Sequence, residues 1–316
     1  MTSNLPLIHI IGSLNTDLTT YTSRIPTGGE TLYANSFLTS SGGKGGNQAV
    51  ACAKLSRTRS LSNATAEICM IGAVGNDAHG HALIADLQQS GVETSGVSPK
   101  DDIETGVAVI LVEEESGENR ILITAGANHS LRPEQFESFE GDVPDLVILQ
   151  LEILVETTLR ILRTARERGV QVLLNPAPAV ELPDEAYVGL KHLVLNETEA
   201  VILSGCDAEA LEDEETLPGV ADVFHGRGAA NVIITLGGKG VFFSGEGGKR
   251  GLVKARNVEV VDTTAAGDTF VGAYALEIVE GGVEIESAVR RANKAAAKTI
   301  GRRGAQKSIP WADELS

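Results

Sequence analysis

The chain of 316 residues is long enough for one large α/β domain or two small ones, and its composition, 42% hydrophobic and 22% charged, is that of an ordinary globular protein. Its 43 acidic and 26 basic residues give a formal net charge of -17, which disfavours partners such as nucleic acid or an anionic membrane.

Three cysteines without metal-ligand spacing are expected to be buried thiols. The opening MTSNLPLIHIIG lacks the basic region of a signal peptide, so we expect a cytoplasmic protein.

Short apolar runs alternate with helical patterns along the chain. Strands are expected at residues 7–11, 68–74, 145–149, 170–174, 192–195 and 231–234. Helices are expected at 49–55, 82–89, 156–168, 268–279 and 285–299. Continuous apolar strands joined by helices predict an α/β fold of three layers, αβα, with a mostly parallel central sheet in a single domain, 1–316.

Two segments interrupt this alternation, at about 15–40 and 103–126. The first contains strand-like pieces at 18–21 and 31–38, and the second contains pieces at 105–112 and 120–124. The polar turn at 113–119, with its Ser-Gly pair, is typical of a β-hairpin. These pieces predict a small antiparallel sheet that forms a lid over the strand ends of the main sheet.

The run DTTAAGDTF at 262–270 leads small residues and Gly267 directly into an apolar helix. The free N–H groups at the start of a helix form a ready anion site. Asp268, in the first turn, is placed to act as a base beside that anion, as phosphate transfer to a hydroxyl requires. The alternative interpretation is that Asp268 only caps the helix.

Three further motifs carry polar groups suited to a sugar and a metal. The run SGGKGGNQ at 41–48 fits neither a Walker A loop nor a dinucleotide fingerprint. Its glycines allow close backbone approach, and Asn47, which is expected to open a helix, offers a polyol both a donor and an acceptor. A lid hinge is the alternative there. Asn15 and Asp17 either grip paired sugar hydroxyls or stabilise a turn. Asn196 and Glu199 share a helical face and either hold magnesium or form a capping box.

Together these four motifs resemble the ribokinase family, a branch of the PfkB carbohydrate kinases, over essentially the whole chain. Agreement extends to Pro26 with residues 29–31, to 72–77 with Gly80, and to 125–128, 150–152, 175–178, 235–237 and 303–306. Gly46 is a departure, since an alanine is usual at that position. Such ordered agreement is far more specific than any single glycine-rich loop.

The resemblance implies a role for each matching residue. Asp268 is implied as the catalytic base, with Ala265, Ala266 and Gly267 as the anion hole. The implied sugar site comprises Asn15, Asp17, Gly43, Lys44, Asn47 and Glu152, and Lys44 need not touch phosphate. The implied ATP site comprises Asn196, Thr235, Gly237, Gly238, Lys239, Gly240 and Gly267, with Asn293 beside the adenine. Mg²⁺ is implied near Asn196 and Glu199, and K⁺ in a cage of Asp262, Thr264, Thr299, Arg302, Gly304 and Ser308. The alternative to the K⁺ site is an ion pair between Asp262 and Arg302, which would need no cation.

The expected reaction is therefore ATP-dependent phosphorylation of D-ribose at its 5-hydroxyl, giving D-ribose 5-phosphate and ADP. The compact set of hydroxyl partners and the scarcity of aromatic residues favour a small free pentose over a nucleoside. Another sugar or nucleoside kinase of the same group stays an alternative. A sugar sensor without turnover is a second alternative, although a sensor would not need Asp268. The missing dinucleotide fingerprint disfavours a dehydrogenase. The resemblance also implies a homodimer that pairs through the lid sheets.

Overall fold

The computed structural model describes residues 5–116, 118–139, 141–279 and 281–315. Their central sheet has nine strands in the order β13-β12-β11-β10-β9-β8-β1-β4-β5. Neighbouring strands from β5 to β11 run parallel, and the pairings of β11 with β12 and of β12 with the edge strand β13 are antiparallel. The strand bounds are β1 Leu7–Ile11, β4 Glu67–Gly75, β5 Val97–Lys100, β8 Leu146–Leu149, β9 Gln171–Leu174, β10 His192–Asn196, β11 Asn231–Thr235, β12 Val241–Ser244 and β13 Arg250–Val253.

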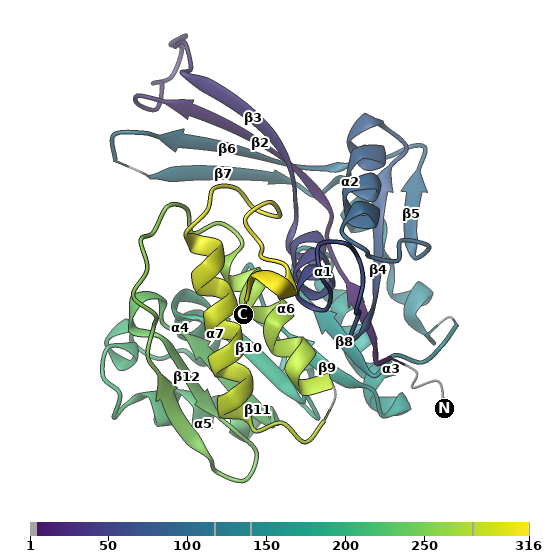
Figure 1. Ribbon diagram of the computed structural model, residues 1–316, viewed down its shortest axis with the longest axis vertical. Helices are drawn as coiled ribbons and strands as arrows, with labels where there is room; N and C mark the ends of the chain where they lie inside the picture. Colours follow the sequence, from purple (N-terminus) through teal and green to yellow (C-terminus); the bar gives the residue numbers. More distant parts are fainter. Residues whose placement is uncertain (1–4, 117, 140, 280, 316) are drawn as a thin grey trace.

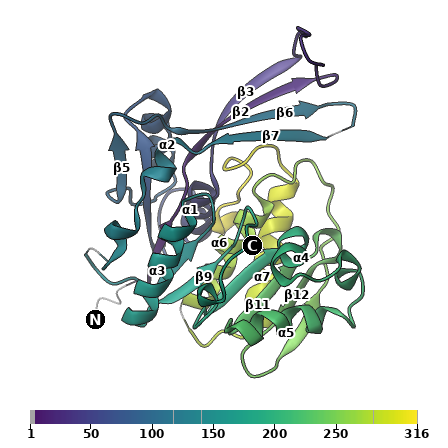
Figure 2. The same ribbon diagram turned by 180° about the vertical axis from the view of Figure 1, so that it is seen from behind.

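Helices cover both faces of this sheet. One face, toward the viewer in Figure 1, carries α1 Lys44–Leu55, α6 Ala266–Val279 and α7 Ile285–Ile300, and α2 Ala78–Gln89 packs into the same core beside β4. The opposite face, seen in Figure 2, carries α3 Val155–Arg168, α4 Glu197–Ser204 and α5 Leu217–Arg227. Successive strand residues such as Ile10 and Ile11 enter opposite cores, which explains why the strands are apolar throughout. The expected three-layer αβα fold is confirmed.

A separate four-stranded sheet extends beyond the layers, in the order β3-β2-β6-β7, and forms the lid. Its strands are β2 Asn15–Thr22, β3 Ser36–Gly42, β6 Gly106–Glu113 and β7 Asn119–Thr124. Pairing is antiparallel in β2–β3 and in the expected hairpin β6–β7, and the two pairs join through a parallel β2–β6 contact. Residue 117, in the expected Ser-Gly turn, lies outside the described residues.

The strand expected at 31–38 begins only at Ser36, because the pairing of β2 with β3 ends where Tyr21 meets Ser36. Tyr33 lies outside that pairing and is 95% exposed.

Helix α1 begins at Lys44, several residues before the expected start at Asn47 or Ala49. Glycines weaken the helical pattern of this segment, but they serve a packing purpose. A Cβ on Gly45 would lie 2.6 Å from the Ser13 nitrogen, so only glycine lets the first turn of α1 rest on the loop after β1. Gly43 precedes the helix with a left-handed φ of 80°.

The three cysteines are free thiols; Cys52 is buried as expected, whereas Cys69 and Cys206 are partly exposed. Within the part of the chain that the structure describes, no helix combines the length and the apolarity needed to cross a membrane.

Candidate active site

Asp268 lies in the first turn of α6, is only 7% exposed, and turns its carboxylate toward α1. Asn47 Nδ2 donates to one carboxylate oxygen and Gln48 Nε2 to the other, each at 3.0 Å. Asp268 is therefore not the cap of its own helix, because its hydrogen bonds go to side chains of α1. Two amide donors fix the carboxylate and leave its remaining lone pairs to accept a proton.

The chain enters α6 through Ala265, whose φ of 60° is left-handed and strained for a residue with a Cβ. Thr269 holds this turn, because its N–H and its hydroxyl both donate to the Ala265 carbonyl at 2.8 Å. No described residue accepts a hydrogen bond from the N–H of Gly267 or of Asp268. A Cβ on Gly267 would meet nothing within 4 Å, so the space beside the Gly267 Cα is open. The arrangement suits an anion beside the Asp268 carboxylate.

The predicted sugar-binding residues converge on the same place from the lid and from α1. Lys44 N–H donates to Glu152 Oε2 at 2.9 Å, and the Ser13 hydroxyl donates to that oxygen at 2.5 Å. Asn15, at the start of β2, accepts from Asn128 Nδ2 at 2.7 Å. Gly43, in its left-handed conformation, leads the chain from β3 into α1. A backbone N–H of α1 and a hydroxyl from the loop after β1 therefore meet Glu152, just beyond the end of β8.

The Asp17 carboxylate faces the same region and carries an unfavourable charge there. Burial, followed by the negative charges of Glu152 and Asp268, raises the pKa of Asp17 to about 7. A Cβ on Gly42 would lie 2.1 Å from Asp17 Oδ2, so this glycine makes room for the carboxylate. Among the described residues, none donates a hydrogen bond to the Asp17 carboxylate, so the hydroxyls of a polyol would supply donors that it needs.

The Lys44 ammonium lies among these carboxylates. Burial opposes its charge, but the negative charges of Asp268, Glu152 and Glu199 together raise the pKa of Lys44. Lys44 is therefore charged at neutral pH and offsets part of the acidic charge of the site.

The Asn47 side chain presents a buried acceptor that has no partner among the described residues. Asn47 Oδ1 is enclosed and receives no hydrogen bond, although the Nδ2 of the same amide binds Asp268. An unpaired buried acceptor costs about 1–3 kcal/mol, so a bound hydroxyl group would relieve it. Asn47 therefore offers a hydroxyl-binding oxygen directly beside the Asp268 carboxylate.

Asn196 and Glu199 form the capping box that was the alternative interpretation of their spacing. The Asn196 side chain accepts from the Glu199 N–H at 2.8 Å, and Glu199 Oε2 accepts from the Asn196 N–H at 2.8 Å. Glu199 is 5% exposed, and burial raises the pKa of its carboxyl. Among the described residues, no group of three or more His, Cys, Asp and Glu side chains could hold a metal ion. A magnesium ion here would therefore need oxygen ligands from bound phosphates and water.

The predicted phosphate loop follows Thr235, the last residue of β11. It makes one 3₁₀ turn, Gly237–Lys239, and closes when Leu236 N–H donates to the Gly240 carbonyl at 2.8 Å. Gly240 has a φ of 116°, and a Cβ there would lie 2.1 Å from the Val253 carbonyl. A cavity of about 410 Å³ adjoins this loop at Gly238 and Lys239. Lys239 also pairs with Glu212, and the amide of Asn293, on α7, donates to the Lys254 carbonyl at 3.0 Å.

Two segments meet where the cation cage is predicted. Asp262 accepts hydrogen bonds from the Thr264 N–H at 2.9 Å and the Gly304 N–H at 2.8 Å. Burial opposes ionisation, but these bonds prevail and lower the pKa of Asp262. The alternative ion pair of Asp262 with Arg302 is wrong, because Arg302 binds Glu314 instead.

The hydroxyls of two other predicted cage residues are engaged within the protein. The Thr299 hydroxyl donates to Thr269 Oγ1 at 2.9 Å and the Ser308 hydroxyl to the Ala305 carbonyl at 2.7 Å. A cation between the two segments would therefore depend on the ionised Asp262 and on carbonyl oxygens, the ligand type that suits K⁺.

The sequence interpretation missed a series of hydrogen-bonded side-chain amides that adjoins the Asp268 carboxylate. Gln48 Nε2 donates to Asn175 Oδ1 at 3.0 Å as well as to Asp268, and Gln150 Nε2 donates to Gln48 Oε1 at 2.7 Å. All three amides lie in segments that match the family, at 41–48, 150–152 and 175–178. An amide directly after an apolar strand was the available signal for Gln150 and Asn175.

The chain resembles known kinases along its whole length. A family model described as pfkB family carbohydrate kinase matches residues 6–312. The ribokinase of Schizosaccharomyces pombe is 41% identical over 309 residues, which cover 96% of this chain and 94% of that protein. A deoxyribokinase of Salmonella typhi is 36% identical over 312 residues, covering 98% of this chain and 97% of the relative.

Solved structures agree with the sequence matches. The structure of Arabidopsis thaliana ribokinase complexed with ribose and ATP superimposes with a TM-score of 0.86 at 30% identity, and covers 99% of this chain and 97% of that one. The match of the family model and these relatives show that this chain belongs to the pfkB family of carbohydrate kinases.

Proposed function

We propose that this protein is a ribokinase, which transfers the γ-phosphoryl group of ATP to the 5-hydroxyl of D-ribose and releases D-ribose 5-phosphate and ADP. The observation that carries the proposal is the Asp268 carboxylate, fixed by Asn47 and Gln48 beside the open N–H groups of Gly267 and Asp268. The ribokinase names of the relatives, and the Arabidopsis structure with ribose and ATP, support the choice of substrates.

In this proposal Asp268 takes the proton of the 5-hydroxyl while the hydroxyl oxygen attacks the γ-phosphorus. The bond from that phosphorus to the β–γ bridging oxygen breaks, and ADP leaves with the electron pair. The free N–H groups of Gly267 and Asp268 stabilise the negative charge on the transferred group, which is the role of an anion hole, whereas the Ala266 N–H donates to the Thr263 carbonyl at 3.2 Å. Because Ala265 already holds the left-handed turn, these donors need no rearrangement when the charge develops.

Sugar recognition is assigned to groups around Asp268. Asp17 and Asn47 Oδ1 would accept from ribose hydroxyls, and the charged Lys44 offers a donor close by. The remaining sugar-site residues proposed are Asn15, Gly43 and Glu152. A deoxyribokinase among the relatives makes 2-deoxyribose the second candidate substrate.

For the nucleotide, we assign the phosphates to Asn196, Thr235 and the loop at 237–240, and the adenine to the neighbourhood of Asn293. Glu199 and Asn196 would hold Mg²⁺ through water and phosphate oxygens, and the ion would supply charge neutralisation of those phosphates. The cage around Asp262, Gly304 and Ser308 would hold K⁺. A clamp at that point would order the start of α6 without touching either substrate.

The lid supports a further assignment, to a homodimer. Apolar side chains of the lid strands are unusually exposed, among them Leu122 at 71% and Phe37 at 62%, with Ile121, Ile123, Leu38 and Val109 also exposed. Exposed apolar side chains on both faces of the lid sheet favour burial against a second copy of the chain. A single domain for residues 1–316, a place in the cytoplasm, and the lack of nucleic acid or membrane partners stay predictions.

The proposal is tested by measuring ADP release with ribose, 2-deoxyribose, fructose and adenosine as acceptors, at saturating ATP and magnesium. We expect kcat/KM to be highest for ribose. A higher kcat/KM for 2-deoxyribose would instead assign the protein as a deoxyribokinase of the same family. Ribose binding without ADP release would leave the sensor interpretation standing.

A further inference from the structure

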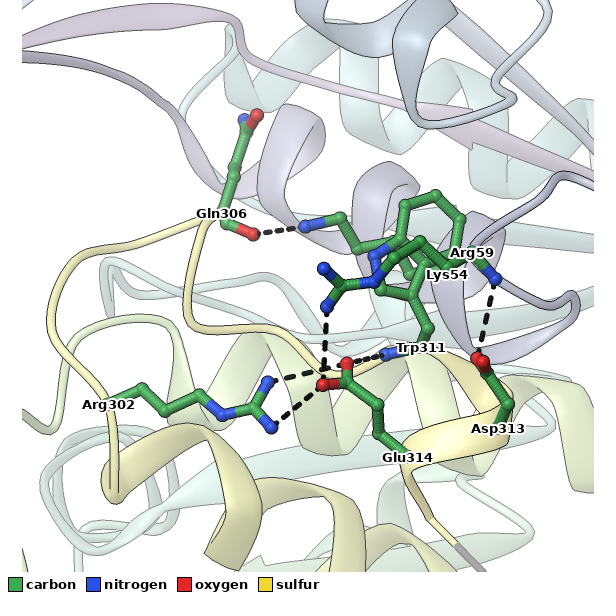
Figure 3. Close-up of polar contacts among 7 residues, drawn as sticks. All are labelled: Lys54, Arg59, Arg302, Gln306, Trp311, Asp313 and Glu314. Atoms are coloured by element: carbon green, nitrogen blue, oxygen red, sulfur yellow. Dashed lines mark hydrogen bonds and ion pairs between the residues drawn. The ribbon is translucent and has the colours of Figure 1, made fainter.

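The C-terminal segment returns to the body of the protein at a single carboxylate (Figure 3). Glu314 accepts hydrogen bonds from the Trp311 N–H at 2.9 Å, from Arg302 at 3.0 Å and from Arg59 at 3.2 Å. Arg302 belongs to the loop after α7, and Arg59 to the loop after α1. The bond from Trp311, with the charges of Arg302 and Arg59, lowers the pKa of Glu314 to about 2, so it is ionised at neutral pH. One carboxylate therefore joins three segments.

A lysine reinforces the same junction from α1. Lys54 Nζ donates to the Gln306 carbonyl at 2.7 Å and lies 5.5 Å from the centre of the Trp311 ring, within the range of a cation–π contact (Figure 3). Lys54 is on the helix whose first turns carry Asn47 and Gln48, the two residues that hold Asp268. The loop at 301–308 is thus tied to α1 at one end and to the C-terminal segment at the other.

That loop contacts the segment that leads into α6. Gly304 N–H donates to Asp262, and Asp262 N–H in turn donates to the Ile300 carbonyl at 3.2 Å. Asp262 also receives the Thr264 N–H, which directly precedes the left-handed Ala265. A continuous series of contacts therefore leads from Glu314, through the loop and Asp262, to the turn that opens the anion hole.

We propose that residues 311–314 form a C-terminal clamp, in which Glu314 and Lys54 are positioning residues for phosphoryl transfer. They touch no reacting atom; they hold the loop at 301–308 in place, so that Asp262 can fix the turn before α6. This inference rests on the proposed kinase function. The competing interpretation is that the clamp only fastens the C-terminus, because partly exposed ion pairs contribute little to stability by themselves.

The test compares Glu314→Gln with the matched control Glu286→Gln. Glu286 also accepts from an arginine, Arg290, and its side chain is 35% exposed against 26% for Glu314, but it lies on α7 away from the clamp. We expect Glu314→Gln to lower kcat about tenfold with the ribose KM changed less than about twofold, and the control to leave both unchanged. Glu314→Asp, which retains the charge, should recover part of the lost kcat.

A second readout needs no turnover. Hydrogen exchange of the Gly304 and Thr264 amides, which both donate to Asp262, should accelerate in Glu314→Gln without substrates and stay unchanged in Glu286→Gln. Trp311 is the single tryptophan of the chain, so its fluorescence reports whether the clamp has opened. A variant whose fluorescence changes while exchange at Gly304 and kcat stay at wild-type values would overturn the proposal.

Lys54→Met removes the second positioning residue. It must show the same fall in kcat and the same faster exchange at Gly304 and Thr264, even if Glu314→Gln does not fold. An unchanged kcat in folded Lys54→Met would equally contradict the proposal. Failure of the wild-type protein to phosphorylate any sugar would instead refute the proposed function, and the exchange experiment would still decide whether the clamp orders the turn.

Discussion

Replacing Asp17 with asparagine should make the ligand-free protein more stable while it damages the sugar site. Burial and the charges of Glu152 and Asp268 raise the pKa of Asp17 from 3.8 to about 7. A rise of that size disfavours the ionised form in the folded protein by about 4 kcal/mol. Asparagine has nearly the same shape and no charge, so Asp17→Asn removes this unfavourable term. We expect a gain of about 2–4 kcal/mol in the free energy of unfolding above pH 7, the lower figure applying where the new amide lacks a partner.

The stability gain of Asp17→Asn must depend on pH, and the raised pKa of Asp17 fixes the direction of that dependence. Between pH 4 and 7 the unfolded chain has lost the Asp17 proton while the folded protein retains it. The stability of the wild-type protein therefore falls as the pH rises through this window, relative to the variant. Below pH 4 the carboxyl is protonated in both states, and above pH 7 it is ionised in both, so the difference is constant outside the window.

Urea unfolding of both proteins at pH 5, 6, 7 and 8 measures this difference directly. We expect the advantage of Asp17→Asn to grow from pH 5 to 7 and then to level off. A difference that is the same at all four values, or a variant less stable than the wild type at pH 8, would refute the account of Asp17 as a buried carboxylate lacking donors.

The remaining predictions concern ligands and assembly. Ribose binding, measured by calorimetry without ATP, should weaken about 10–150-fold in Asp17→Ala, because the variant loses a charge-assisted bond of about 1.5–3 kcal/mol. In the wild-type protein, ribose should bind more weakly below pH 7, where Asp17 is protonated. Unchanged binding in Asp17→Ala would remove Asp17 from the sugar site. Activity should be higher in potassium chloride than in sodium chloride at equal ionic strength, because K⁺ sheds its water more easily; equal rates would argue against the cation site. Leu122→Lys should shift the protein from dimer to monomer in sedimentation, since it places a charge on the exposed apolar lid; a wild-type protein that is already monomeric would rule out the lid interface.

The sequence was most informative where a local pattern decides the structure. The strands predicted at 7–11 and 145–149 agree with β1 and β8 to within one residue, because parallel strands buried on both faces are apolar at every position. The edge strands β5 and β13 and the neighbouring strand β12 were missed. β5 and β13 contain polar or charged residues, and β12 has only three consecutive apolar residues, so none of them has the continuous apolar run that identified β1 and β8.

The start of α1 was misplaced for a different reason. Glycines are poor helix formers, and the propensity argument places them in a loop. Their use here depends on how closely Gly45 approaches Ser13, which is a tertiary contact that local propensity does not report.

The residues of the candidate site also differ in how far the sequence alone predicts them. Asp268, Asp17 and Asn47 stand in compact motifs whose chemistry is readable in sequence, and the structure brings them together. The bond from Gln48 to Asp268 joins residues 220 positions apart, and only the packing of α1 against α6 creates it. The partner of Arg302 was not predictable from the sequence either. An ion pair with Asp262 was the alternative to a cation site, but the C-terminal segment brings Glu314 to Arg302 instead.

The most direct test of the central claim is the turnover of Asp268→Asn with ribose and ATP. Asparagine keeps the shape of the side chain but can neither take the proton nor carry the charge. A positioned general base contributes about 10²–10⁴-fold, so we expect kcat to fall at least 100-fold while ribose binding, measured by calorimetry, is retained. An Asp268→Asn protein that binds ribose and turns over at a rate near that of the wild type would contradict the assignment of Asp268 as the catalytic base.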